Sequence, residues 1–295
     1  MKRQDKNPDR ITLSCADGIQ LQARLFTGND PIAAILVSSG TGFPQSFYDP
    51  IARYLSGRGA AVLTYDYRGI AASRGTWPDP AIDVPDWGRL DMNAAIRFLR
   101  QRYPDLPIVH IGHSVGGHLI GFASAHREIM RHALVCCGSG TWYKHWPSRW
   151  MLELYFWWWL GPLSIARTGE VRPKGGWRGS PLPRQVFRTW RRWSHQGGYY
   201  REELANGLAP NYFGEISGPI RSWIFKDDGI GTVRAAKDIL DCFPNARSGI
   251  ISRQPADYGL VRLGHQGCFR PGCEAIWDEW WEWLVESPEV SRLVA

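Results

Sequence analysis

A serine between two glycines, in the run Gly112-His113-Ser114-Val115-Gly116, has the surroundings that nucleophilic catalysis needs. Apolar residues 108–111 precede this run, and residues 118–123 have the composition of a buried helix. A strand, a G-x-S-x-G turn and a helix form a nucleophile elbow, whose strained turn lifts the serine hydroxyl clear of the strand. We expect glycine at positions 112 and 116 because a Cβ there would collide with the neighbouring strand and helix. The alternative is a glycine-rich turn in which the serine only caps a helix.

The elements that would position this serine alternate along most of the chain. Residues 11–15 and 19–26 alternate apolar and polar side chains, which predicts an antiparallel hairpin. Apolar runs predict buried strands, and apolar residues at helical spacing predict helices. Asp86 is the expected N-cap of the helix over residues 86–103. The further strands cover residues 33–37, 61–65, 108–111, 133–137, 220–225 and 249–251, and the helices 47–57, 86–103, 233–243 and 274–285. This alternation predicts an α/β fold, with a mostly parallel sheet flanked by helices.

The regular alternation stops between residues 142 and 217. This segment is rich in Trp, Arg and Pro, has no clear strand, and contains nine of the sixteen tryptophans of the chain. We interpret residues 142–217 as a helical cap inserted over the sheet. Residues 1–141 and 218–295 would then form one core domain.

The sequence resembles the α/β-hydrolases, and more narrowly the predicted bacterial hydrolases of the serine aminopeptidase-like S33 type. Residues 40–48, 63–70 and 112–117 carry the resemblance, together with Leu263-Gly264-His265, where the family places its catalytic histidine. Ala71 departs from the pattern, because relatives commonly have a second glycine there, and so does Ser39, where many relatives have histidine. The resemblance implies the α/β-hydrolase fold, with a triad in the chain order serine, acid, histidine.

That order selects the base and the acid. A serine hydroxyl needs a base within hydrogen-bond reach, and only His265 of the eight histidines lies beyond residue 195. Asp228 is the expected acid because Asp228-Gly229-Ile230-Gly231 follows the spacing of the relatives, with Gly231 in place of a proline. Its carboxylate would fix the imidazole tautomer and stabilise the imidazolium. Asp227 and Asp257 are the alternative acids.

The remaining expected site residues stabilise charge and bind substrate. The backbone N–H groups of Val115 and Thr41 are the expected oxyanion donors. Trp157, Trp158 and Trp159 are expected to cover the apolar part of the substrate, with the cap acting as a lid. The alternatives are a cap that buries its own tryptophans and a cap that makes peripheral contact with a membrane surface.

Composition excludes other classes of protein. The formal net charge is +7, but no block of Lys and Arg accompanies it, which argues against a nucleic-acid partner. Six cysteines without a CxxC motif or zinc-type spacing predict no metal and no cofactor. The polar start, residues 1–7, lacks the apolar stretch of a signal peptide, and with unpaired thiols this favours the cytoplasm.

Together these residues predict a cofactor-independent serine hydrolase. An ester or thioester of a small-to-medium apolar acyl compound would acylate Ser114, and water activated by His265 would release the acid. The expected partner is thus a small-molecule acyl substrate. An acyltransferase with the same triad is one alternative, and a non-catalytic hydrolase-like protein that binds a ligand is another.

Overall fold

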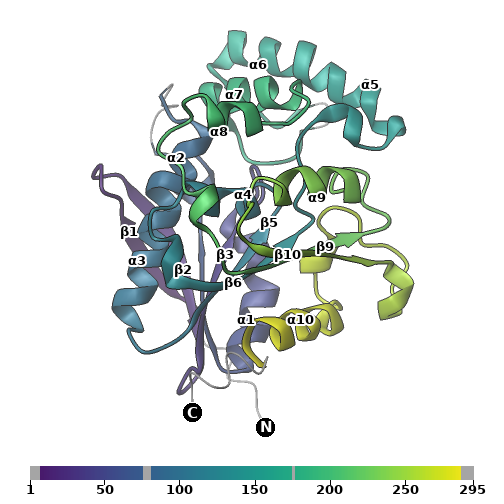
Figure 1. Cartoon of the computed structure of the whole chain (residues 1–295). Helices are drawn as coiled ribbons and strands as arrows, with labels where there is room; N and C mark the ends of the chain where they lie inside the picture. Colours follow the sequence, from purple (N-terminus) through teal and green to yellow (C-terminus); the bar gives the residue numbers. More distant parts are fainter. Residues whose placement is uncertain (1–6, 76–80, 175–176, 287–295) are drawn as a thin grey trace.

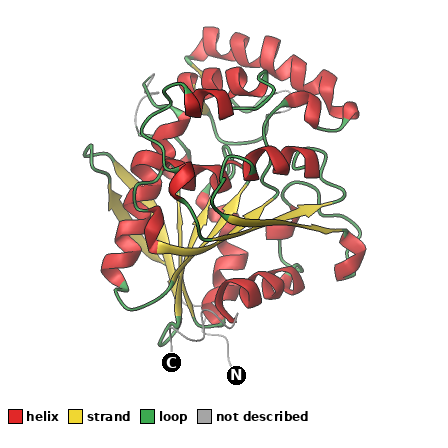
Figure 2. Ribbon diagram, in the orientation of Figure 1, coloured by secondary structure: helices red, strands yellow, loops and turns green. Residues whose placement is uncertain are grey.

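The computed structural model describes residues 7–75, 81–174 and 177–286, so the polar start, residues 1–6, lies outside the described chain. An eight-stranded sheet runs through its centre in the order β1-β2-β4-β3-β5-β6-β9-β10 (Figures 1 and 2). Strand β2 is antiparallel to β1 and β4, and every later neighbour is parallel. The strands are β1 (Asp9–Ser14), β2 (Gln20–Thr27), β3 (Ala33–Ser38), β4 (Ala60–Tyr65), β5 (Ile108–His113), β6 (Ile129–Val135), β9 (Pro219–Phe225) and β10 (Arg247–Arg253). The predicted hairpin and mostly parallel sheet are confirmed.

Helices cover both faces of the sheet. Helices α1 (Asp49–Gly57) and α10 (Glu274–Trp281) contribute buried residues to one hydrophobic core, and α3 (Asn93–Arg102) and α9 (Val233–Leu240) to the other. Strand β3 serves both cores, since Ile35 belongs to the first and Leu36 to the second. Two-sided burial is the reason that the central strands are continuous apolar runs in the sequence.

The remaining core elements are short. They are α2 (Val84–Asp86), α4 (Val115–His118), the π-helical segments η3 (Trp87–Met92) and η11 (Glu282–Glu286), and the 3-10 turns η1 (Gln45–Tyr48), η2 (Ala71–Ser73), η4 (Leu119–Phe122), η5 (His126–Glu128), η8 (Phe213–Glu215), η9 (Pro255–Tyr258) and η10 (Gly267–Phe269). Two predicted boundaries were wrong. The helical stretch before α3 is capped by Asp83, and Asp86 is the third residue of that capping box. Strand β6 begins at Ile129, and its first half contains two buried polar residues, Arg131 and His132, that interrupt the apolar run.

The cap, residues 142–217, lies above the sheet in Figure 1 as a group of helices. Its elements are η6 (Trp142–Lys144), α5 (Pro147–Tyr155), η7 (Phe156–Leu160), α6 (Gly161–Thr168), α7 (Arg184–Ser194) and α8 (Arg201–Ala205). It also holds a two-residue pair, β7 (Glu170–Val171) with β8 (Leu182–Pro183), which the sequence did not predict. None of its described residues joins the eight-stranded sheet. The division into core and cap stays our interpretation.

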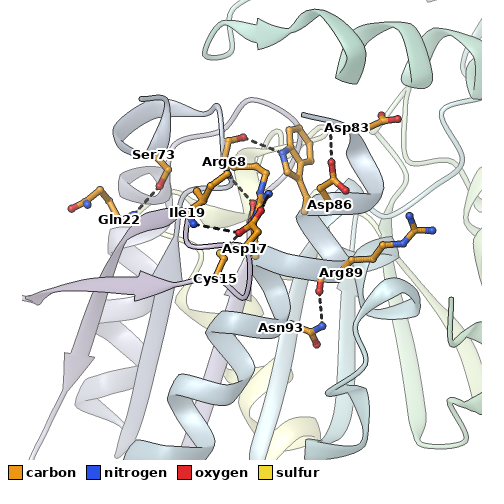
Figure 3. A network of polar contacts seen from close by, with 12 residues as sticks. Cys15, Asp17, Ile19, Gln22, Arg68, Ser73, Asp83, Asp86, Arg89 and Asn93 are labelled. Carbon is orange, nitrogen blue, oxygen red and sulfur yellow. Dashed lines mark hydrogen bonds and ion pairs between the residues drawn. The ribbon is translucent and has the colours of Figure 1, made fainter. Parts of the chain in front are cut away.

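A partly buried ion-pair network joins the β1–β2 turn to the loop after β4 and to η3 (Figure 3). The guanidinium of Arg68 donates to Asp91 at 2.6 Å and to Asp17 at 2.6 Å, and the backbone N–H of Arg68 donates to Asp91 at 2.8 Å. The side chain of Arg68 is 5% exposed and that of Asp91 is 0% exposed, whereas that of Asp17 is 35% exposed. Arg68 therefore depends on Asp91 for its buried charge partner.

We expect Asp91→Ala to lower the free energy of unfolding by about 3–5 kcal/mol, because it leaves the buried Arg68 cation with only a partly exposed partner. Asp17→Ala should cost less than about 1 kcal/mol, because water can replace an exposed carboxylate. Urea unfolding of the two variants at neutral pH checks this. Equal losses would show that the network is not organised around Asp91.

Candidate active site

The turn at Ser114 has the geometry that the sequence predicted. Strand β5 ends at His113, and Ser114 has φ 51° and ψ −121°, a conformation that is strained for any residue with a side chain. A Cβ on Gly112 would lie 2.5 Å from the Cα of Gly117 in α4. A Cβ on Gly116 would lie 2.3 Å from the backbone oxygen of Ser38 at the end of β3. The predicted need for both glycines is confirmed.

Three side chains from distant parts of the chain meet at this turn. The Nε2 atom of His265 lies 3.1 Å from Ser114 Oγ, and its Nδ1 atom lies 2.8 Å from Asp228 Oδ2. A carboxylate can only accept a hydrogen bond, so Nδ1 of His265 carries the proton. Nε2 of His265 is then free to accept the serine proton. The three residues follow β5, β9 and β10, whose carboxyl ends lie along one edge of the parallel sheet. The arrangement is that of a base aimed at a nucleophile.

Asp228 is held as a carboxylate in the interior. Its side chain is 0% exposed, and the backbone N–H of Ile230 donates to its Oδ1 at 2.8 Å. Burial alone would raise the pKa of Asp228, but the charge and hydrogen bond of His265 and the N–H groups of Ile230 and Gly231 outweigh it and hold the pKa below its usual value. A proline at position 231, as in the relatives, would have no N–H to donate.

The two alternative acids have other partners. Asp227 Oδ2 accepts from the backbone N–H groups of Leu263 at 2.8 Å and Gly264 at 2.9 Å, so it anchors the loop that carries His265. Asp257 is exposed and accepts from the backbone N–H of Gln254 at 2.9 Å. The anchoring role of Asp227 could not be predicted from the sequence, because only the fold brings residues 227 and 263 together.

The expected oxyanion donors lie beside the serine. Val115 is the first residue of α4, where backbone N–H groups point outward and the helix dipole favours negative charge. Thr41 lines the same cavity as Ser114. The N–H of Gly40, its neighbour, already donates to the Tyr48 hydroxyl at 2.8 Å. The assignment of Thr41 and Val115 stays a prediction.

A cavity of about 950 Å³ separates the cap from the triad. Phe156, Trp157, Trp177 and Trp190 line it from the cap side and contact one another through their rings. Trp157 is 3% exposed, but Trp158 is 53% and Trp159 is 70% exposed, and neither lines the cavity. The prediction that all three bind substrate was wrong for these two. Successive residues of a helix point in different directions, so Phe156 and Trp157 face the cavity while Trp158 and Trp159 do not.

Arginines contribute positive charge to the lining of the cavity. Arg149 donates to Glu153 at 3.0 Å, and Glu153 also contacts His145 Nδ1 at 2.7 Å, so this carboxylate is already shared. Three further lining arginines have no ion pair within the described part of the chain: Arg178, Arg262 and Arg270. They come from a cap loop and from both sides of His265, so they flank the triad.

Cys136, Asp228 and His265 have metal-ligand atoms within 4.8 Å of one another, the one such group in the described residues. Both imidazole nitrogens of His265 are engaged by Ser114 and Asp228. Burial raises the pKa of the Cys136 thiol well above its usual value, and a thiol binds metals poorly unless it ionises. The group therefore fits the triad better than a metal site. All six cysteines are buried and unpaired.

The sheet order, the elbow at Ser114 and the loop positions of Asp228 and His265 define an α/β-hydrolase. The family model of serine aminopeptidase, S33, matches residues 29–172, a stretch that includes Ser114. The chain thus has the α/β-hydrolase fold, and residues 29–172 are similar to the serine aminopeptidase-like S33 family. The matched stretch ends before Asp228 and His265, so their placement rests on the geometry.

Curated relatives are similar to part of this chain in sequence, and solved structures share its fold. Monoglyceride lipases of Mus musculus and Homo sapiens are 32% and 33% identical over 115 and 116 residues, which is 38% of this chain and 37% of each lipase. The similarity thus spans little more than a third of these relatives. A soluble variant of monoglyceride lipase from Saccharomyces cerevisiae has a TM-score of 0.66 at 15% identity, covering 96% of each chain. Est1E from Butyrivibrio proteoclasticus, with ferulic acid bound, has a TM-score of 0.60 at 16% identity, covering 94% of this chain and 98% of its own.

A helix that crosses a bilayer must be both long and apolar, and the described residues form several helices. None of them combines the necessary length with the necessary apolar composition.

Proposed function

We propose that this chain is a serine hydrolase that cleaves a carboxylic ester or thioester through an acyl-enzyme on Ser114. The observation that carries the proposal is the hydrogen-bonded series from Ser114 through His265 to Asp228. His265 would accept the Ser114 proton as the hydroxyl attacks the carbonyl carbon, and would return it to the leaving group. Water that loses its proton to the same imidazole would then release the acid and restore Ser114.

Acyl transfer is the second candidate, because an alcohol or thiol could replace water in the last step. It would use the same residues, so only the product distinguishes it. A non-catalytic binding role has less support, since it does not require the serine and histidine to lie 3.1 Å apart. Because the mouse and human relatives are monoglyceride lipases, monoacylglycerols are the first esters to test.

The cavity supports an apolar acyl group and a polar leaving group. Aromatic side chains of the cap lie over the triad, where they would cover an acyl chain and exclude water from the acyl-enzyme. Arg178, Arg262 and Arg270 line the cavity and are exposed to solvent, so they could contact a leaving group as it departs. Their uncompensated charge favours a leaving group that carries a phosphate, a carboxylate or another anion.

The rate should depend on acyl length. Each buried CH₂ contributes about 0.8 kcal/mol, so kcat/KM should rise roughly fourfold per carbon until the cavity is full. We expect this rise from C2 to C12 p-nitrophenyl esters to flatten in Trp157→Ala and to persist in Trp159→Ala, a matched change at an exposed tryptophan. A wild-type profile that does not vary with length would mean that the cap packs only on itself.

We also propose that the cap contacts a lipid surface. Of the ten large apolar side chains that are exposed in the described chain, seven come from one stretch of the cap, residues 146–163: Trp146, Met151, Leu152, Tyr155, Trp158, Trp159 and Leu163. We call these seven the cap ridge. Leu152 and Tyr155 also line the cavity, so the ridge is continuous with the path to Ser114. Arg191 stacks on Trp158, and Trp with Arg suits the interfacial depth of a bilayer.

Flotation with phosphatidylcholine vesicles, with and without phosphatidylglycerol, tests this contact. We expect the wild-type chain to float and the double variant Met151→Ser/Trp159→Ser to bind at least about tenfold more weakly, since two apolar side chains lose their burial. Ile32→Ser, which alters an exposed apolar residue outside the cap, should float like the wild type. Absence of flotation with both kinds of vesicle would exclude a lipid partner for the ridge.

A further inference from the structure

His113, the residue before the nucleophile, has one hydrogen-bond partner on each ring nitrogen. Its Nδ1 atom lies 2.7 Å from the Tyr48 hydroxyl oxygen, and its Nε2 atom lies 2.8 Å from the backbone oxygen of His265. Both His113 and Tyr48 are fully buried, and neither lines the cavity above Ser114. Their effect on the reaction must therefore pass through the residues that they contact.

The direction of each hydrogen bond follows from the chemistry of the groups. The carbonyl oxygen of His265 can only accept, so Nε2 of His113 carries the proton and donates it. Burial lowers the pKa of His113 to about 3, so the ring is neutral in the physiological range and Nδ1 is an acceptor. The Tyr48 hydroxyl then donates to Nδ1, and its oxygen accepts from the backbone N–H of Gly40 at 2.8 Å.

These bonds form one directed series from Gly40 through Tyr48 and His113 to His265. Gly40 precedes Thr41, the expected oxyanion donor in the loop after β3, and His265 is the expected base in the loop after β10. The series thus joins two loops that are more than 200 residues apart in sequence and that flank Ser114. A side chain at position 40 would block it, because a Cβ there would lie 2.9 Å from His113 Nδ1.

Packing holds the two rings in place. The His113 ring lies 4.8 Å from Phe269 and 5.1 Å from Phe43, centroid to centroid, and the Tyr48 ring lies 5.0 Å from Phe269. With so little freedom, a shift of either loop would stretch a hydrogen bond between buried groups, which is costly. The two loops therefore have one favoured spacing.

We propose that His113 and Tyr48 are positioning residues that fix the oxyanion loop and the base relative to Ser114. The inference rests on the proposed function of the triad. Because neither residue touches the cavity, their loss should lower kcat and leave KM unchanged. Substrate binding would stay intact while the reacting groups are misplaced.

Single-hydroxyl and ring variants test this. Tyr48→Phe keeps the ring packing and removes the link, and we expect kcat to fall by about tenfold to a hundredfold, the range for an unpaired buried group. His113→Leu should lower kcat at least as much. His113→Gln should lower kcat less, because the glutamine amide can still donate a hydrogen bond toward the His265 carbonyl. Tyr200→Phe is the control, since Tyr200 is a buried tyrosine whose hydroxyl has no partner among the described residues; it should retain the wild-type kcat.

A double variant separates a linked series from independent packing. If the residues act as one series, Tyr48→Phe/His113→Leu should lose little more than His113→Leu alone. The rate of labelling by a fluorophosphonate should fall in parallel with kcat. Wild-type kcat in Tyr48→Phe, or losses that follow only the melting temperature across all variants including Tyr200→Phe, would overturn the positioning role. A wild-type chain that neither hydrolyses esters nor takes the label would instead overturn the proposed function itself.

Discussion

Replacement of Ser114 by alanine is expected to reduce ester hydrolysis to less than about one per cent of the wild-type kcat, because Ser114 carries the hydroxyl that lies 3.1 Å from the His265 base. Alanine keeps the Cβ of serine, so the strained turn at φ 51° and the packing around it should not change. The free energy of unfolding should therefore stay within about 0.5 kcal/mol of the wild type, as for a substitution that leaves packing unaltered.

A matched serine keeps this comparison specific. Ser222 lies buried in β9, and its hydroxyl has no partner among the described residues. Ser222→Ala should retain full turnover. If purified Ser114→Ala kept more than a few per cent of the activity with its fold intact, the nucleophile would have to be sought elsewhere.

Asp228→Asn should cost about 10⁴-fold in kcat, the loss known when the orienting carboxylate of a serine triad becomes an amide. The buried carboxylate both fixes the proton on Nδ1 of His265 and balances the imidazolium charge. An amide can balance no charge, and its NH₂ group would favour the wrong tautomer. The pKa of Asp228 lies below its usual value, so the wild-type carboxylate is charged at neutral pH.

The neighbouring acids supply graded controls for this change. Asp227→Asn should lower kcat much less than Asp228→Asn, because the amide oxygen can still accept hydrogen bonds from the N–H groups of Leu263 and Gly264. Asp257→Asn should retain wild-type kcat, since Asp257 is exposed and only accepts from Gln254. Steady-state kcat for the three variants decides between them. A large loss confined to Asp257→Asn would transfer the acid to the 255–258 turn.

Local pattern was sufficient to predict most of the fold. Buried parallel strands are continuous apolar runs, and amphipathic helices repeat apolar residues at helical spacing, so β3, β4, α9 and α10 lie close to their expected positions. The elbow was predictable because steric crowding at Gly112 and Gly116 leaves no room for other residues. Boundaries were less predictable where a nearby residue could also cap a helix, as Asp83 does in place of Asp86.

The orientation of side chains in the cap could not be predicted from composition. Trp157, Trp158 and Trp159 are adjacent and chemically identical, and only the packing of η7 on the cap decides that the first faces the cavity. Long-range contacts were equally hidden. The link from Tyr48 through His113 to His265 depends on which loops the sheet order brings together, and no local pattern records that.

Labelling of the wild-type chain with a fluorophosphonate, followed by peptide mass spectrometry, tests the central claim most directly. The reagent needs a serine that is activated by a base and an oxyanion that is stabilised by donors. We expect one adduct per chain, on the peptide that contains Ser114, with labelling strongly slowed in Asp228→Asn. An adduct on another residue, or no adduct on the folded protein, would contradict the claim that Ser114 is an activated nucleophile.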